Sequence, residues 1–199
     1  MNDFLTAIKA RRTYYGIGKG FVALDDRIEQ LVKDAVLHTP SAFNSQSARV
    51  VLLLAGEHDA FWDLTKEALR KIVPAANFAA TEEKINSFRA GYGTVLFFEE
   101  QTVVQGLQAQ FPLYKDNFPL WSNHSSGMLQ LVVWTALEQA GFGASLQHYA
   151  PLVDEGVQQK WHTPPTWKLI AQMPFGKPVA DPGEKTFQPV EERVKVYRS

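Results

Sequence analysis

The densest apolar stretch of the chain is 127-GMLQLVVWTALEQAG-141. Its apolar side chains fall on nearly every side of a helix, whereas a helix on a protein surface shows a single apolar stripe. We therefore predict a central buried helix rather than a surface helix. Two short apolar runs, 93-GTVLFFE-99 and 167-WKLIAQM-173, have the length and the hydrophobicity of strands.

Strands and helices alternate along the rest of the sequence. The segment 49-RVVLLL-54 is typical of a buried strand, and residues 25–37 carry an apolar stripe at helical spacing, with Asp26 and Glu29 resembling a capping box. The other predicted elements are helices at 3–10, 59–73, 81–90 and 102–110, a strand at 144–149, and a short helix opened by Pro151. This alternation, without an internal repeat, favours an α/β or α+β fold in one domain spanning residues 1–199.

Composition limits the class of protein and its surroundings. The chain has 199 residues, of which 45% are hydrophobic, so it can bury a sizeable core. A net charge of −1 gives no general attraction to nucleic acid or to an acidic membrane. No apolar stretch reaches the roughly 18 residues that span a bilayer, and the N-terminus lacks a signal-peptide core. We therefore expect a cytoplasmic protein without nucleic-acid or membrane partners, and the absence of Cys fits a reducing compartment.

The sequence changes character at about residue 177. The segment 177-KPVADPGEKTFQPVEERVKVYRS-199 is rich in Pro and charged residues, too polar for a core element and too long for a frayed end. A tail of this kind commonly wraps a neighbouring surface, and the obvious surface is that of a partner subunit. We therefore predict a tail that wraps the other chain of a homodimer.

Common catalytic motifs are missing from the sequence. It has no G-x-S-x-G nucleophile elbow, no Walker A loop and no complete G-x-G-x-x-G. Its five His lack the spacing of a helix-borne metal site. We therefore expect no metal and no nucleotide held in these standard ways, and we interpret His124 and His148 as structural.

Two segments have the chemistry of a binding site, and the first is 9-KARRTYY-15. The β-branched and aromatic residues after Arg12 weaken a continuing helix, which frees Arg11 and Arg12 to converge on one anion, with the Thr13 hydroxyl as a further donor. A phosphate suits that arrangement. The alternative is that paired Arg at a helix C-terminus only favour the helix dipole and solvent.

The second segment is the polar loop 41-SAFNSQS-47, which precedes a strand. Asn44 and Gln46 each offer a donor and an acceptor on one amide, which suits the carbonyl and imide edges of a planar heteroaromatic ring. If the segment is extended, both amides lie on the same side. The alternative is a turn that caps itself through Ser and Asn side chains.

In combination, these segments resemble the FMN-dependent nitroreductase family. The likeness is carried by RRTYY, HTPSAFNSQSARVVLL, AGYGTVLFFEE, FPLWSNHSSGMLQLVVWTALEQAGFGASLQHYAP, MPFGKP and EKTFQPVEERVKVY, so it covers nearly the whole chain. Within the family, the chain resembles the short branch related to the yeast fatty-acid-repression-mutant protein. The resemblance implies an α+β homodimer with a central mixed or antiparallel sheet, surrounding helices, and two FMN molecules at the subunit interface.

The resemblance also implies an FMN site built from phosphate ligands and from contacts to the flavin ring. The predicted phosphate ligands are Arg11, Arg12, Thr13 and Lys185, with Tyr15 nearby. The predicted ring contacts are Ser41, Asn44 and Gln46 of the other subunit, Leu146 and Gln147 beside the ring with a backbone N–H near N5, and Lys84 near the pyrimidine end. Many relatives carry a second basic residue where this chain has Phe187, which leaves the phosphate more dependent on Arg11 and Arg12.

The implied function is that of an oxidoreductase in which FMN carries hydride from NAD(P)H to a nitroaromatic or quinone acceptor by a ping-pong mechanism, with no catalytic side chain. Aromatic residues would line the slot for these small aromatic acceptors, with core packing as the alternative for each: Phe43, Tyr92, Phe111, Tyr114, Phe118 and Trp121. Two other readings stay open. One is an FMN-binding redox sensor of stress or lipid metabolism with incidental turnover, and the other is a binding protein without flavin.

Overall fold

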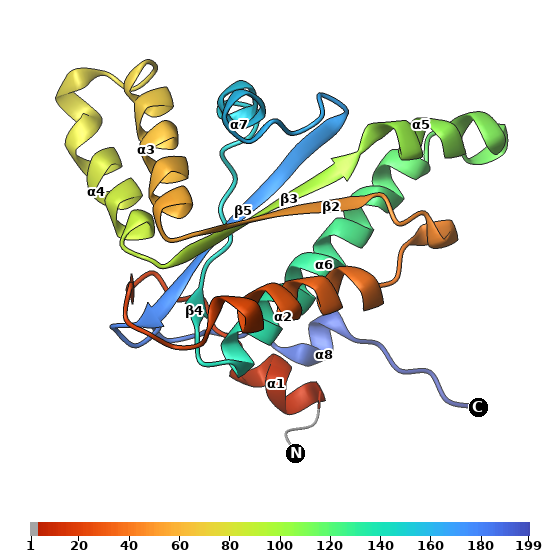
Figure 1. Cartoon of the computed structure of the whole chain (residues 1–199). Helices are drawn as coiled ribbons and strands as arrows, with labels where there is room; N and C mark the ends of the chain where they lie inside the picture. The colour runs from red at the N-terminus through yellow and green to blue at the C-terminus, as the bar shows by residue number, and fades with distance from the viewer. Residues whose placement is uncertain (1–3) are drawn as a thin grey trace.

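The structure, a computed structural model, describes residues 4–199 and contains an antiparallel sheet with helices on both faces (Figure 1). The strands lie in the order β1-β5-β3-β2, and the short β4 pairs with β5. Their bounds are β1 Ile17–Gly18, β2 Ala48–Leu54, β3 Gly93–Glu100, β4 Gly143–Ala144 and β5 Trp167–Pro178. The fold is therefore α+β, as predicted, and β2 is an edge strand whose single neighbour within the described chain is β3.

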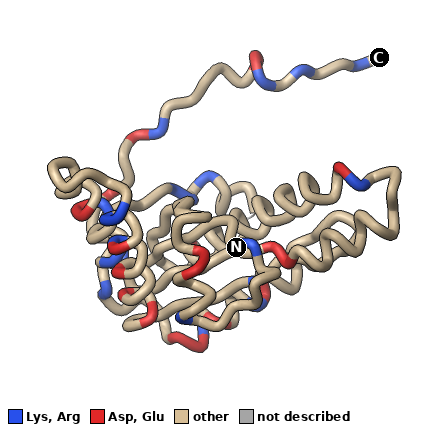
Figure 2. The backbone as a smooth tube through the Cα atoms, turned by 90° about the horizontal axis from the view of Figure 1, so that it is seen from above, with Lys and Arg blue, Asp and Glu red and all other residues tan. Residues whose placement is uncertain are grey.

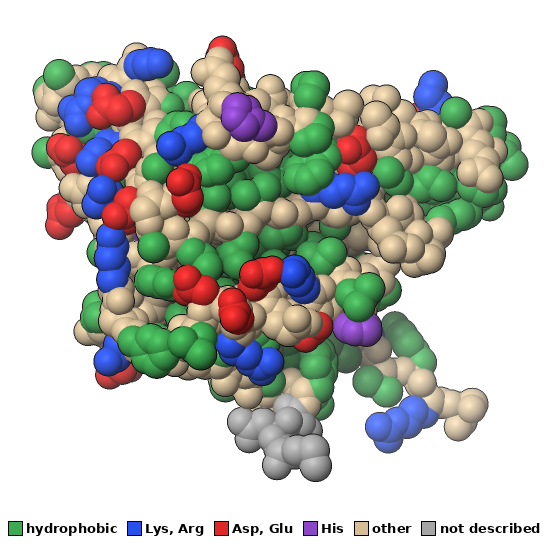
Figure 3. Space-filling model, viewed as in Figure 1, with side chains coloured by type: hydrophobic (Ala, Val, Ile, Leu, Met, Phe, Trp, Pro, Cys, Tyr) green, Lys and Arg blue, Asp and Glu red, His purple; other side chains and the backbone are tan. Residues whose placement is uncertain are grey.

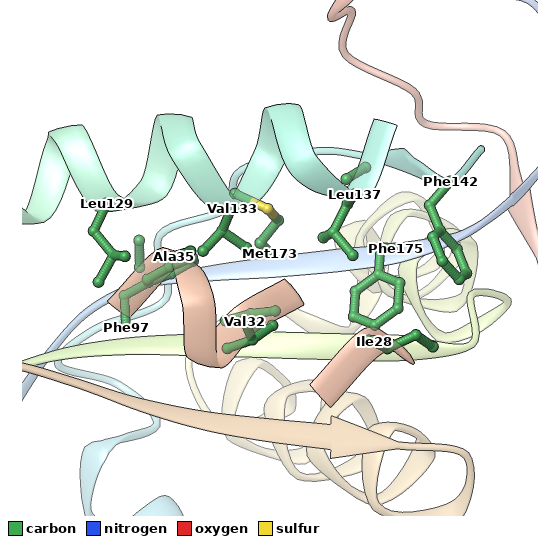
Figure 4. Packing of buried hydrophobic residues seen from close by; sticks show 13 residues of the cluster. Ile28, Val32, Ala35, Phe97, Leu129, Val133, Leu137, Phe142, Met173 and Phe175 are labelled. Atoms are coloured by element: carbon green, nitrogen blue, oxygen red, sulfur yellow. The ribbon is translucent and has the colours of Figure 1, made fainter. Parts of the chain in front are cut away.

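One face of the sheet is covered by α2 (Asp25–His38) and α6 (Phe118–Gln139), with α1 (Phe4–Ala10) against α6 (Figure 1). The buried stripe of α2 recurs every three or four residues, so it faces the sheet along its whole length. Figure 4 labels side chains that fill this layer, among them Ile28, Val32, Val133, Leu137, Phe97 and Met173. Burying each larger side chain contributes roughly 1.5–3 kcal/mol, so this layer is the main core.

The other face is covered by α3 (Gly56–Arg70), α4 (Phe78–Arg89) and α7 (Asp154–Trp161). Its buried side chains include Phe61, Trp62, Ile85, Phe88, Phe98 and Val157. His58 is fully buried in this layer, with Nδ1 2.8 Å from the Thr94 hydroxyl and Nε2 3.2 Å from the Arg89 carbonyl oxygen. Burial lowers the pKa of His58 to about 4, so the ring is neutral at pH 7.

At one end of the molecule, residues 101–121 form an arm that extends past the sheet (Figure 2). The arm consists of α5 (Gln101–Gln110), the 3₁₀ turn η3 (Pro112–Tyr114) and the first turn of α6. Glu100 caps α5, because its carboxylate accepts a hydrogen bond from the Thr102 backbone N–H at 3.1 Å. This cap fixes the direction in which the chain leaves β3.

Two elements are less buried in the single chain than their sequences predict. The central helix begins at Phe118, well before residue 127, and its Met128, Leu131 and Val132 are between 39% and 41% exposed. In β2, Leu53 is buried, whereas Val50 and Leu52 are only partly covered. The predictions of a fully buried helix and a buried strand are therefore wrong for one chain, and an apolar helix face of this kind is typical of an interface.

Other differences concern the ends of elements. The predicted capping box is wrong, because α2 begins at Asp25 with Leu24 at its N-cap and no side-chain cap, and Asp25 and Asp26 favour the helix dipole instead. The strand predicted at 144–149 is only β4 and a single bridge from Gln147 to Gln172. The helix after Pro151 begins at Asp154. Of the helix predicted at 3–10, residue 3 lies outside the described residues.

After β5 ends at Pro178, the chain leaves the body as an extended tail, residues 179–199, that contains only the short helix α8 (Val190–Arg193) (Figure 2). From Gly183 to the end, every residue is exposed, including Phe187 at 77% and Tyr197 at 91%. Large apolar side chains on an extended, exposed segment indicate that it packs on something outside this chain. Within residues 4–199, no helix is long and apolar enough to cross a membrane.

Candidate functional site

The segment after α1 lies against β4. Helix α1 ends at Ala10, close to the end that the β-branched and aromatic residues 13–15 predict. Thr13 then forms a parallel bridge with Ala144, and the Tyr14 backbone N–H donates to the Ala144 carbonyl at 2.9 Å. This pairing places Arg11–Thr13 next to the stretch that continues from β4 to Gln147. Two groups of predicted FMN residues, far apart in sequence, therefore lie side by side.

Arg11 is half-buried against α6. Its guanidinium lies 4.4 Å from the centre of the Trp134 ring, and its Nη1 is buried without a hydrogen-bond partner in the described chain. An unpaired, buried guanidinium donor costs free energy, so this atom points to an acceptor outside the chain. An anion such as a phosphate has the chemistry that this donor requires.

Arg12 is held at two points. Its backbone N–H donates to Glu138 Oε2 at 2.7 Å, and its guanidinium donates to the Gly183 carbonyl of the tail. Burial raises the pKa of Glu138, whereas the hydrogen bond from Arg12 and the charges of Arg11 and Arg12 lower it. Within the described chain the two guanidiniums thus have different partners, the Trp134 ring for Arg11 and the Gly183 carbonyl for Arg12.

Lys185 joins Arg12 at a single cavity of about 540 Å³. We call this the basic corner, and its lining residues are Ile8, Lys9, Arg12, Glu184, Lys185 and Phe187. The Lys185 ammonium lies 5.1 Å from the centre of the Phe187 ring, a cation–π contact that orients the lysine. The structure therefore brings the tail lysine to the arginine segment, and Phe187 forms a wall where a second positive charge is missing.

The polar loop of residues 41–47 has an unusual backbone. Phe43, Asn44 and Gln46 adopt φ values of 57°, 49° and 48°, and Ser41 Oγ closes the loop by accepting the Gln46 backbone N–H at 2.9 Å. The loop is not extended, so the premise that extension aligns the two amides is wrong. Both amide side chains are exposed, and neither has a hydrogen-bond partner among residues 4–199. Backbone strain of this kind is concentrated at functional sites, and here it presents two free amides.

Gln147 makes hydrogen bonds within the chain through both its backbone and its side chain. Its backbone N–H donates to the Gln172 carbonyl at 2.7 Å, and its side-chain amide donates to Ser145 Oγ at 3.1 Å. Leu146 is half-buried, and in the described chain its backbone N–H has no partner. If a backbone N–H of this stretch reaches a ligand, the geometry favours that of Leu146.

Lys84 lies apart from these groups, and the Tyr15 side chain is exposed beside the arginine segment. Lys84 is exposed on α4, which covers the opposite face of the sheet from α1 and α6 (Figure 1). Within one chain the structure does not bring Lys84 to Arg11 or to the polar loop. Tyr15 is 61% exposed and continues the Arg11–Tyr14 segment toward solvent.

The polar loop and the basic corner open into different cavities. Ser41 and Gln46 border a cavity of about 630 Å³ between α2, β2 and α6, and this cavity contains no residue of the basic corner. Its walls are mainly apolar, and Figure 3 shows hydrophobic side chains on this face between charged ones. One chain therefore carries two separate parts of the predicted site.

Five of the six predicted slot aromatics lie together. Phe43 is the centre of the cluster, with ring centres 5.1 to 6.1 Å from those of its four neighbours, and its ring is stacked at 16° on one of them, Trp121. The four neighbours are Phe111, Tyr114, Phe118 and Trp121. Tyr92 is elsewhere and donates its hydroxyl to Asp25 at 2.6 Å. The cluster joins the polar loop to the arm.

Sequence reasoning missed the contribution of α6 to the arginine segment. Trp134 and Glu138 are four residues apart, so they lie on one side of the helix, and both contact the segment that follows α1. A single acidic residue within the apolar stretch 127–141 was the signal available. A carboxyl in such a stretch requires a donor, and the Arg12 backbone supplies it.

The arrangement found here, a five-stranded antiparallel sheet with helices on both faces, an arginine segment against β4 and a strained polar loop before β2, is the nitroreductase fold of a class of oxidoreductases. The structure superposes on nitroreductase CinD from Lactococcus lactis with a TM-score of 0.91 and 41% identity, covering 98% of this chain and 100% of that chain. The chain belongs to the nitroreductase family, whose profile matches residues 8–177.

Further relatives are similar along their whole length. The nitroreductase FRM2 of Saccharomyces cerevisiae is 35% identical over 198 residues, which covers 98% of this chain and 97% of that protein. The CinD structure above contains chloramphenicol, and another CinD structure, 42% identical with a TM-score of 0.90, contains 4-nitrophenol. A nitroreductase from Desulfovibrio desulfuricans solved with FMN is only 16% identical, with a TM-score of 0.70, and shares the fold.

Proposed function

We propose that this oxidoreductase binds FMN and uses NAD(P)H to reduce nitroaromatic and quinone acceptors. The observation that carries the proposal is the buried, unpartnered Nη1 of Arg11, the residue that precedes Arg12 of the basic corner in the sequence. A dianionic phosphate supplies the acceptors that these donors require. A related fold is known with FMN, which supports the choice of phosphate ligand.

The proposed residues divide the work of holding the cofactor. Arg11, Arg12, Thr13 and Lys185 hold the phosphate, and Tyr15 borders it. The amides of Asn44 and Gln46, oriented by Ser41, bind the polar edge of the ring, while Leu146 and Gln147 flank it. When bound, FMN would accept hydride from NAD(P)H and pass it to the acceptor in two separate half-reactions. The protein's part is to bind, orient and shield the ring.

We also propose that the site is completed by a homodimer. The polar loop and the basic corner open into separate cavities of one chain, so a second chain is needed to bring a loop to a basic corner. Three features support this assembly: the exposed apolar face of α6, the open edge of β2, and the apolar side chains of the extended tail. Together they offer the kind of surface that obligate dimers bury.

The proposed acceptors follow from the aromatic cluster and from the relatives. CinD, a close structural relative, is known with chloramphenicol and with 4-nitrophenol, which are both nitroaromatic. The aromatic cluster at Phe43 offers flat faces for similar rings beside the polar loop. Quinones share the flat, electron-poor ring and belong to the same proposal.

An absorbance experiment tests the function. Purified protein should show a flavin spectrum that bleaches when NADH or NADPH is added without oxygen, and the spectrum should return when 4-nitrophenol or a benzoquinone is added. Protein that neither contains flavin nor takes up added FMN would contradict the proposal. Flavin that binds but does not bleach would favour a redox sensor over a reductase.

A further inference from the structure

A buried carboxyl, Glu99, lies behind the polar loop and takes no part in the proposed chemistry. Glu99 is 1% exposed, at the end of β3, and its Oε2 accepts a hydrogen bond from the Ser47 hydroxyl at 2.6 Å. Ser122 of α6 adds a second hydroxyl contact. The other oxygen, Oε1, is buried and has no partner in the described chain. The carboxyl thus connects the end of the loop to the central helix.

Direct contact between Glu99 and a ligand is not what this geometry favours. Ser47 and Ser122, the two partners of Glu99, border a cavity of about 10 Å³ under the loop. That volume holds about one water molecule and is far too small for a flavin ring or an aromatic acceptor. Glu99 therefore acts on the loop and not on the reacting atoms.

The polar loop needs such an anchor, because its backbone is strained. Three residues in left-handed conformations each cost free energy, and they persist only where surrounding contacts fix them. The other anchors are the Ala42 N–H, which donates to Ser125 Oγ at 3.4 Å, and the Arg49 guanidinium, which donates to the Gln46 carbonyl at 2.8 Å. Among these anchors, Glu99 is the single acid.

We propose that Glu99 is a positioning residue that, in its neutral form, holds Ser47 and Ser122 and so keeps the polar loop in its ligand-binding conformation. The proposal rests on the proposed function, because the ligand of the loop is FMN. Neutral Glu99 suits a site where one oxygen has no donor, since an ionised carboxylate with an unpaired buried oxygen is costly. Ionisation strengthens the two hydroxyl contacts but leaves a buried charge with an unpaired oxygen, and opening of the loop to water relieves this larger cost.

The charges around Glu99 do not cancel this effect. Burial is the largest cause and raises the pKa of Glu99, whereas the hydrogen bonds from Ser47 and Ser122 and the charge of Arg49 lower it. Lys168, which is paired with Glu99 on the neighbouring strand β5, is exposed. Glu100, the residue after Glu99, accepts a hydrogen bond from the Thr102 backbone N–H instead. The sequence of α5 carries no charge, and on α6 the nearby titratable residue is the exposed His124. The pKa of Glu99 is therefore raised overall, and the neutral form persists above the usual range of a carboxyl.

The test measures the dissociation constant of FMN from pH 5 to pH 9 in the wild type, Glu99→Gln, Glu99→Ala and a matched control, Glu100→Gln. Glutamine keeps an oxygen that accepts from Ser47 but cannot ionise, so Glu99→Gln should bind FMN as tightly as the wild type at pH 5 and lose the weakening at high pH. Glu99→Ala should bind at least tenfold more weakly at every pH. The control should keep the wild-type pH profile.

Hydrogen exchange separates failure of this proposal from failure of the proposed function. Without FMN and at one pH, Glu99→Ala should lose protection at the Asn44, Ser45 and Gln46 amides, which close the loop, and Glu99→Gln should keep it. The proposal is overturned if Glu99→Ala matches the wild type in protection, or if Glu99→Gln keeps the wild-type pH profile of FMN binding. Wild-type protein that takes up no FMN would instead overturn the proposed function, and the exchange result would still decide the role of Glu99.

Discussion

Arg11 has the most specific environment of the predicted site residues. The ring of Trp134 covers its guanidinium, and one nitrogen is buried without an acceptor. The sequence also allowed Arg11 to be an ordinary solvent-facing arginine that favours the helix dipole, but a covered guanidinium with a buried, unpaired nitrogen does not fit that role. The residue type and the position were predictable, but the stacking partner was not, because it comes from a helix more than a hundred residues away.

Replacement of Arg11 with Gln should weaken FMN binding at least tenfold, since a charge-assisted hydrogen bond to phosphate contributes roughly 1.5–3 kcal/mol. The measurement is fluorescence titration of apoprotein with FMN. Arg27→Gln, an exposed arginine on α2, is the control and should bind like the wild type. Equal affinity in both variants would contradict the assignment of Arg11.

His58 predicts an acid sensitivity of the fold. Its pKa is about 4 in the folded protein against 6.5 as the ordinary value, so the unfolded chain binds the extra proton first as pH falls. Stability should decline from about pH 6.5 down to about pH 4, by up to about 3 kcal/mol. Urea unfolding across this range measures it. In His58→Gln, whatever its stability at pH 7, the free energy of unfolding should lack the part of the decline between pH 6.5 and pH 4 that His58 causes.

At the scale of elements, the strongest periodic and apolar segments were predicted well. Helix α2 and strands β2 and β3 lie within one residue of the predicted bounds, because hydrophobic spacing fixes which side chains face the core. The strand predicted at 144–149 failed because Ser145 and Gln147 bond individually to β5 and form no continuous ladder. The loop conformation was also unpredictable, since three of its non-glycine residues have positive φ and its contacts to Ser125 and Glu99 come from distant parts of the sequence.

The aromatic cluster links the arm to the polar loop, so it should affect acceptors more than the cofactor. Trp121→Ala removes the ring stacked on Phe43 and should raise the KM for 4-nitrophenol about fivefold, in line with roughly 1 kcal/mol for such a contact. The FMN affinity should change less. Leu113→Ala is the control on the same arm, because Leu113 is 93% exposed. An unchanged KM in Trp121→Ala would contradict this role and would indicate that the aromatic cluster serves only in core packing.

At the scale of the whole molecule, the single chain leaves apolar surface and a strand edge uncovered. An apolar face on α6, an open edge on β2 and an extended tail are all features that a second copy would cover. The sequence predicted the tail from its composition. It could not predict the exposed face of α6, because a helix that is apolar all round is equally consistent with burial within one chain or between two.

Deletion of residues 186–199 should test the tail while retaining Lys185. We expect light scattering to move from about twice the chain mass of 22.4 kDa toward a single chain, with loss of bound flavin. Deletion of only the last two residues is the control and should leave the assembly unchanged. A truncated protein that stays dimeric would show that α6 and β2 suffice.

The separation of the polar loop from the basic corner has a genetic consequence. If each site takes its loop from one chain and its corner from the other, a change at Arg11 and a change at Asn44 damage different halves of the same site. At an FMN concentration too low to load either variant, Arg11→Gln and Asn44→Ala should then restore each other when mixed, because a hybrid pair contains one site with both defects and one with none. Such complementation recovers up to about a quarter of the original activity after random reassortment, since half of the pairs are hybrids with one intact site of two.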